Sequence, residues 1–143
     1  MSNFICTISA TGLHNWDICK QISAWGVATN GMKVTLPEVK SGDRLFIYRA
    51  SKGIIATATV SDKIRIPLER AETPWAGGLF RYGALVPFRQ VIEYDSPVKV
   101  TFEKMRITNT SISATALRRG FSSISDSDAQ ELNSILKQVS KNI

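Results

Sequence analysis

Histidine and cysteine are scarce in this sequence of 143 residues. It contains one histidine, His14, and two cysteines, Cys6 and Cys19, with no C-x-x-C pair. These ligands are too few to assemble a zinc site, so we expect no metal. Cys6 stands in an apolar run and Cys19 on the face of an expected helix, where free cysteine behaves as a small buried hydrophobe. We expect no disulfide in a reducing compartment.

Long apolar runs are also missing from the sequence. No stretch approaches the ~18 residues that a membrane-crossing helix needs. The segment from Met1 to Thr11 has neither the basic start nor the cleavage site of a secretory signal. Because no polybasic tail or basic amphipathic helix is visible, we expect no membrane partner and a soluble, cytoplasmic protein.

Sequence motifs typical of enzymes do not occur. There is no G-x-S-x-G elbow, P-loop, G-x-G-x-x-G or H-E-x-x-H, and His14 has no nucleophile at a recognisable spacing. Asp126 and Asp128 are close together, but acids stabilise the positive end of a helix, and a helix is expected to start there. We therefore predict that the protein is not an enzyme, with no catalytic residues and no cofactor.

The charge balance points to a class of partner. Eighteen lysines and arginines stand against twelve aspartates and glutamates, for a formal net charge of +6. This excess favours a polyanionic partner without identifying it. The length and the apolar content of 43% suit one compact domain with one core.

Hydrophobic periodicity predicts both helices and strands. An amphipathic pattern predicts a C-terminal helix from about Asp126 to Ser140, capped by Ser125 or Ser127. A shorter helix is expected from about Asn15 to Ser23. Strands are predicted at Phe4–Ile8, Leu45–Tyr48 and Ile54–Val60, with two or three more within Leu79–Val91, bent near Pro87, and Val98–Ile107. Proline and glycine interrupt Asp62–Gly78, which is predicted to be a long loop of a kind that is often functional.

Six short motifs occur in an order that resembles the EVE domain family. They are Asn15-Trp16, Ala24-Trp25-Gly26-Val27, the stretch Ser41–Tyr48 with sequence SGDRLFIY, Gly53-Ile54-Ile55-Ala56, Pro87-Phe88-Arg89, and Gly120-Phe121 before the terminal helix. The resemblance extends over nearly the whole chain. It implies a single EVE domain over residues 1–143.

EVE domains are similar in fold to YTH and PUA domains. The resemblance therefore implies an α+β fold with a mixed, barrel-like sheet of five to six strands and flanking helices. EVE-like domains bind modified bases, several of them in modification-dependent restriction systems. The implied partner is nucleic acid with a modified base, DNA in preference to RNA, and the implied further partner is a nuclease or motor domain in the same chain or operon. Two alternatives stay open: an RNA-binding PUA-like module, and a small-molecule or protein-interaction module without nucleic acid.

The resemblance also implies a set of site residues. Trp25 matches the YTH tryptophan that forms one wall of an aromatic cage, and Asn15 matches the position whose side chain contacts the base edge. Trp75 stands where YTH proteins place a second cage tryptophan. Arg70 occupies the place of a third aromatic, so Phe80, Tyr82 or neither completes the pocket. The predicted set comprises a base pocket of Asn15, Trp25, Gly26, Trp75 and Tyr82, with Arg118 and Arg119 as phosphate ligands.

These residue types suit a flipped base. Stacking on aromatic side chains contributes about 1–3 kcal/mol per base, against the few kcal/mol that unstacking costs. The asparagine amide offers both a donor and an acceptor to a base edge. Structural roles remain open for each residue: Trp25 and Trp75 as core, Asn15 as the N-cap of the first helix, and the arginine pair as a solvated face. Trp16 is assigned to the core.

Overall fold

The computed structural model describes residues 1–33 and 35–141. The first half contains strands β1 and β2 around helix α1, followed by the β3–β4 hairpin: β1 (Asn3–Ile8), α1 (Leu13–Ile22), β2 (Ala24–Ala28), β3 (Arg44–Arg49) and β4 (Gly53–Val60). The second half contains one long strand, short elements and the terminal helix: η1 (Arg70–Glu72), α2 (Gly78–Arg81), β5 (Tyr82–Val98), β6 (Phe102–Glu103), β7 (Arg106–Ile107), α3 (Ala114–Arg118), β8 (Phe121–Ile124) and α4 (Asp126–Lys141).

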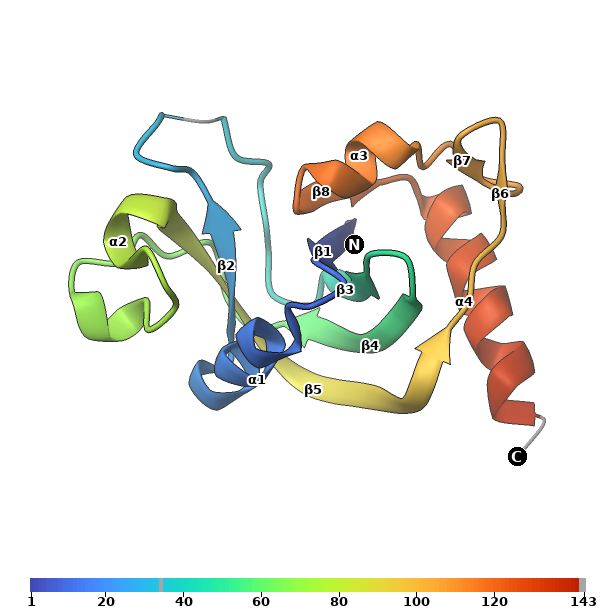
Figure 1. Ribbon diagram of the computed structural model, residues 1–143, viewed down its shortest axis with the longest axis horizontal. Coiled ribbons are helices and arrows are strands. Elements are labelled where there is room, and N and C mark those ends of the chain that lie inside the picture. The colour runs from blue at the N-terminus through green and yellow to red at the C-terminus, as the bar shows by residue number, and fades with distance from the viewer. Residues whose placement is uncertain (34, 142–143) are drawn as a thin grey trace.

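The main sheet is mixed and strongly curled (Figure 1). Within the described residues it has six strands in the order β2-β5-β4-β3-β1-β8, and β6 and β7 form a separate two-stranded ribbon. Strand β1 runs parallel to β3, while the other neighbouring pairs are antiparallel. The sheet is therefore a half-barrel, which confirms the predicted α+β class and the upper value of the predicted strand number.

Strand β5 differs from the expected pattern. Separate strands were predicted before Val91 and after Val98, but β5 is continuous from Tyr82 to Val98. It pairs with β2 up to Pro87 and with β4 from Phe88 onward. Gln90 has a φ of 52°, at a bulge where the register with β4 shifts, so the strand bends without ending. The sequence predicted a bend near Pro87; the bulge lies at Gln90 instead, and a bulge at a glutamine carries no simple sequence signal.

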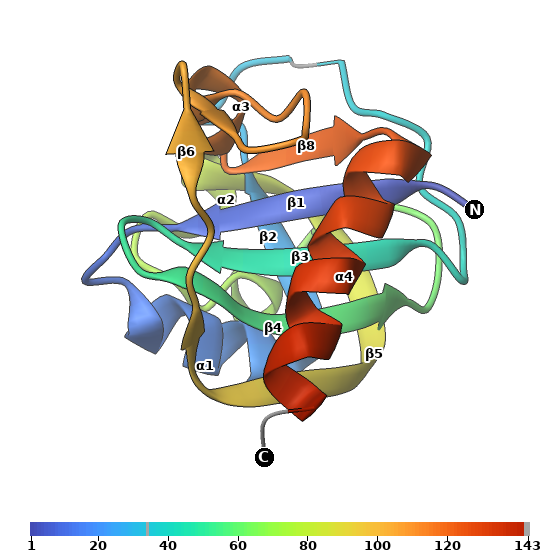
Figure 2. The ribbon, with the colours of Figure 1, turned by 90° about the vertical axis from the view of Figure 1, so that its right-hand side faces the viewer.

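Two apolar clusters lie on opposite faces of the sheet, as the alternation along β3 requires. Leu45 and Ile47 belong to the cluster with α1, while Phe46 and Tyr48 belong to the cluster with α4. Figure 2 shows α4 lying across the strands, and its buried Leu132 packs in the second cluster. Helix α1 packs on the other cluster.

Helix α4 begins as the sequence predicts. The Ser125 hydroxyl accepts a hydrogen bond from the Asp128 N–H at 3.1 Å, so Ser125 is the cap and not Ser127. Asp126 accepts a bond from the side-chain amide of Asn3, and Asp128 accepts two from Ser111. The acid pair therefore joins the helix start to the rest of the fold.

Helix α1 begins earlier than predicted. It starts at Leu13, and the Gly12 carbonyl accepts the Asn15 N–H at 3.0 Å. Asn15 consequently lies inside the first turn, and its interpretation as the N-cap is wrong: Gly12 holds that position without a side-chain cap. Trp16, predicted to be core, is 2% exposed and packs against Phe88 with ring centroids 5.8 Å apart.

Both cysteines are buried and free, as the sequence predicts. Among residues 1–33 and 35–141, no helix is long and apolar enough to cross a membrane. Five of the described elements were not predicted, namely β2, η1, α2, α3 and β8, and all are five residues or shorter. Such short elements contain too few residues for a hydrophobic period to be recognised in the sequence.

Candidate nucleic-acid interface

A cavity of about 250 Å³ opens where six parts of the fold meet. The end of β1, helix α1, strand β2, the loop before α2, the α2–β5 junction and the α3–β8 turn all contribute to its wall. The structure brings all seven predicted site residues to this cavity: Asn15, Trp25, Gly26, Trp75, Tyr82, Arg118 and Arg119. Their positions range over more than a hundred residues of sequence, so only the fold places them together.

Three aromatic side chains, Trp25, Trp75 and Tyr82, form what we call the aromatic cluster. Each is at most 9% exposed and belongs to the core on the α1 side of the sheet. The rings of Trp75 and Tyr82 lie 4.9 Å apart between centroids, at an interplanar angle of 49°. Trp25 and Trp75 are therefore core residues and cavity-lining residues at the same time, because each is buried and each borders the cavity.

Trp75 is held by two contacts although it lies in an irregular loop. Its indole Nε1–H donates to the backbone carbonyl of Asn15 at 3.1 Å. Its ring also packs on Gly26, where a Cβ would lie 3.1 Å from the ring and 3.0 Å from Cδ1 of Tyr82. A side chain at position 26 would push these rings, so glycine lets the aromatic cluster close over β2.

The Asn15 side chain is half-buried at the cavity. Within the part of the chain that the structure describes, its amide makes no hydrogen bond to protein, while its backbone carbonyl anchors Trp75. The side-chain donor and acceptor are therefore available to a ligand. Of the two candidates for a third aromatic, Tyr82 lines the cavity and Phe80 does not; Phe80 is 70% exposed.

Arg118 and Arg119 lie at the C-terminal end of α3 and are exposed at the cavity. The next residue, Gly120, has a φ of +80°, a conformation that glycine adopts easily. Its carbonyl accepts the Thr7 N–H at 2.8 Å, which fastens the turn to β1. Neither guanidinium forms an ion pair within the described residues, so both remain free to bind an anion.

Sequence reasoning missed part of the lining. Arg81 is a third arginine at the cavity, with its guanidinium carbon 5.3 Å from the centroid of the Tyr82 ring. Its position beside Tyr82 in the sequence was the available signal. Thr7 and Ser9 also line the cavity, but the end of a strand gives no local indication of that role.

The remaining ionisable groups of the lining are neutral at physiological pH. Burial raises the pKa of the Cys19 thiol to about 12. Burial also raises the pKa of the Tyr82 hydroxyl. Among the described residues the lining contains no carboxylate, so its charge comes from the three arginines and is positive.

Comparison with known proteins gives a fold relationship. No protein-family model matches the sequence, and no curated protein matches it. Among solved structures, the chain is similar to a hypothetical protein from Leishmania major, with a TM-score of 0.64, 15% identity and 96% of each chain covered. It is also similar to the YTH domain of the Zygosaccharomyces rouxii MRB1 protein in complex with N6-methyladenosine RNA. That match has a TM-score of 0.54 and 13% identity, and it covers 93% of this chain and 86% of the other. The chain therefore has a YTH-like α+β fold.

Proposed function

We propose that this protein binds nucleic acid by taking one modified, methylated base into the cavity beside the aromatic cluster. One observation carries the proposal: a small cavity has aromatic walls and arginines around it, with no carboxylate. Its volume of about 250 Å³ lies just below the range of roughly 300–1,000 Å³ that is typical of small-molecule sites. That size suits one flat base.

Stacking supplies the energy in this mechanism. A base that leaves its helix loses a few kcal/mol of stacking and pairing, and aromatic side chains return about 1–3 kcal/mol per base. Trp25, Trp75 and Tyr82 provide the aromatic surface, and the Asn15 amide provides the polar contact to the base edge. A methyl group then fills an apolar corner of the cavity.

The arginines supply affinity that does not depend on sequence. Arg81, Arg118 and Arg119 are exposed at the cavity and would contact the phosphates on either side of the flipped nucleotide. Guanidinium groups suit this role because their planar donors match phosphate oxygens. Binding should consequently weaken as salt rises.

The proposed substrate is DNA, and the proposed setting is a modification-dependent restriction system. Both follow from the resemblance of the sequence motifs to EVE domains, and a nuclease or motor in the same chain or operon would act on the bound DNA. RNA is the second candidate, favoured by the solved YTH domain of similar fold, whose complex contains N6-methyladenosine RNA.

Binding without catalysis is part of the proposal. Among the described residues of the cavity lining, Cys19 carries the one thiol, and its pKa of about 12 keeps it protonated, whereas a nucleophilic cysteine needs a thiolate. The arginine side chains offer hydrogen-bond donors and no acceptor. The lining thus favours recognition over chemistry.

A panel of oligonucleotides tests the proposal. Identical DNA and RNA oligonucleotides would carry N6-methyladenine, 5-methylcytosine or no modification, and dissociation constants would be measured at several salt concentrations. We expect a preference for one modification and a log–log salt slope of roughly −2 to −3, from about three phosphate contacts. Equal binding of every modified and unmodified oligonucleotide would contradict base recognition. Dissociation constants that do not change with salt concentration would favour a small-molecule or protein-interaction module over a nucleic-acid-binding domain.

A further inference from the structure

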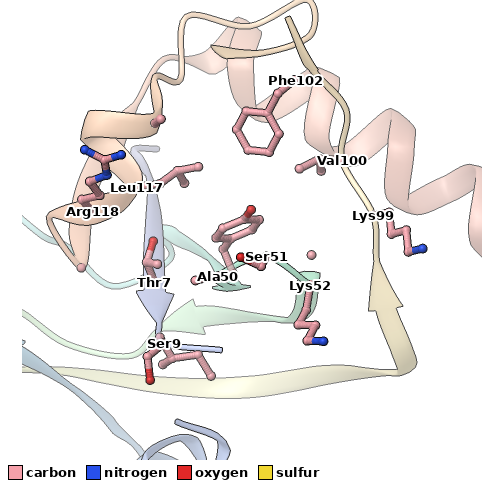
Figure 3. Close-up of a pocket in the computed structure, with 15 residues that line it drawn as sticks. Thr7, Ser9, Ala50, Ser51, Lys52, Lys99, Val100, Phe102, Leu117 and Arg118 are labelled. Carbon is pink, nitrogen blue, oxygen red and sulfur yellow. The ribbon is translucent and has the colours of Figure 1, made fainter. Parts of the chain in front are cut away.

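A second, larger cavity adjoins the first. It has a volume of about 810 Å³ and lies between the end of β1, the β3–β4 turn, the segment after β5 and helix α3. Figure 3 shows Phe102 and Leu117 projecting from different sides of this cavity, with Arg118 on the α3 side and Lys52 and Lys99 on the other. The base-binding role proposed above makes no use of this cavity.

The two cavities share a wall. Thr7, Ile8, Ser9, Arg118 and Gly120 line both of them. The two cavities are therefore adjacent, and Arg118 belongs to the wall that they share. The Thr7 hydroxyl oxygen lies in this wall and, within the described residues, is buried without a hydrogen-bond partner.

The second cavity combines apolar surface with positive charge. Val100, Leu117 and the 45% exposed ring of Phe102 offer an apolar surface. Lys52, Lys99 and Arg118 line the same cavity, whereas no carboxylate of residues 1–33 and 35–141 does. The two lysines are exposed and form no ion pair within the described residues. This combination of a stacking surface and phosphate-binding cations is typical of single-stranded nucleic-acid sites.

We infer that the second cavity holds the nucleotide next to the modified one, so that the two cavities bind consecutive positions of a single strand. The inference rests on the function proposed above and adds a second subsite to it. The neighbouring base stacks on Phe102, and Arg118 binds the phosphate that joins the two nucleotides. Lys52 and Lys99 bind the next phosphate along the strand.

Ligands of increasing length test the inference. The probes are the 2′-deoxynucleoside 5′-monophosphates of N6-methyladenine and 5-methylcytosine, and trinucleotides with each modified base between two thymidines. We expect the preferred trinucleotide to bind about 10-fold or more tightly than its monophosphate, because it adds one stacked base and further phosphates. Phe102→Ala should remove most of that gain and leave the affinity for the monophosphate unchanged.

Matched variants separate the subsite from general effects. Met105→Ala alters an exposed apolar side chain on the same ribbon that lines neither cavity, and it should keep the full gain. The double variant Lys52→Ala/Lys99→Ala should weaken only the trinucleotide, whereas Lys63→Ala/Lys137→Ala, which removes two exposed lysines elsewhere, should not. The lysine pair also provides a readout if the Phe102 variant fails to fold.

The outcomes distinguish this inference from the proposed function. A monophosphate that binds, with a trinucleotide that binds no better, would overturn the second subsite and leave the base pocket intact. The second subsite is also overturned if the trinucleotide still binds more tightly than the monophosphate, by the parental factor, in both Phe102→Ala and Lys52→Ala/Lys99→Ala. If neither monophosphate and neither modified trinucleotide binds better than the unmodified thymidine trinucleotide, the proposed function is overturned. The second subsite is then overturned with it.

Discussion

Two regions of the core are both buried but differ in chemistry. Beneath α4, Ile5, Phe46 and Leu132 are at most 1% exposed and form what we call the α4 core. The aromatic cluster of Trp25, Trp75 and Tyr82 is at most 9% exposed on the other face of the sheet. The cluster alone borders the 250 Å³ cavity with its unpaired arginines. Burial therefore does not distinguish a packing region from a candidate site, whereas a cavity and its charge do.

The largest expected effect lies in the α4 core. Leu132→Ala should lower the free energy of unfolding by about 2–5 kcal/mol, because it removes a fully buried side chain and leaves a cavity. The ratio of affinities for modified and unmodified oligonucleotide should not change. Denaturant titration and binding measurements would check both values. A changed ratio would show that the α4 core and the aromatic cluster are coupled, and would contradict their separate roles.

Gly26 provides the next largest effect. Gly26→Ala would place a Cβ 3.0–3.1 Å from Tyr82 and Trp75, so the rings must move and the cavity must change shape. Affinity for the modified oligonucleotide should fall about 10-fold, near the low end of the roughly 1–3 kcal/mol cost of overpacking. Gly83→Ala is the matched control, because a Cβ there would strike the Thr29 hydroxyl away from the cavity. Similar affinity losses in both variants would indicate general strain.

The arginine pair should act on salt dependence rather than on specificity. Arg118→Ala/Arg119→Ala should weaken binding to modified and unmodified sequences alike and reduce the log–log salt slope by about one unit per lost phosphate contact. Lys137→Ala, on α4, should leave the slope unchanged. If the arginine variant keeps the parental slope, the pair is a solvated surface.

The smallest effect concerns pH and one thiol of the cavity. Burial raises the pKa of Cys19 from 9.0 to about 12, so the folded state keeps the proton to higher pH than the unfolded state does. This contribution to stability is complete below pH 9 and is lost as pH rises toward 12. Between pH 8 and pH 10 it should remove about 1 kcal/mol. Denaturant titrations of the parent and of Cys19→Ala should show a smaller alkaline loss in the variant; equal losses would contradict the assignment.

The sequence predicted which residues share a cavity better than it predicted the elements that carry them. Trp25, Trp75 and Asn15 were found because a family resemblance relates distant positions, and α4 because sixteen residues repeat one clear period. The position of Asn15 within α1 was wrong, since cap preference alone cannot exclude Gly12 as the cap. Arg81 and the Thr7–Ser9 wall were missed, because their place at the cavity depends on how the sheet curls.

Two tryptophans allow the most direct test of the central claim, that the cavity holds a modified base. Trp16 and Trp25 are both buried in the same cluster, but only Trp25 lines the cavity. Replacing either with alanine should cost about 3–5 kcal/mol of stability. The measurement is the ratio of affinities for modified and unmodified oligonucleotide, with circular dichroism as a check on folding and phenylalanine variants at both positions as milder substitutions.

We predict that Trp25→Ala lowers this ratio by about 1–3 kcal/mol, the stacking energy of one base, while Trp16→Ala leaves it at the parental value. A folded Trp25→Ala protein that prefers the modified base as strongly as the parent would contradict the account.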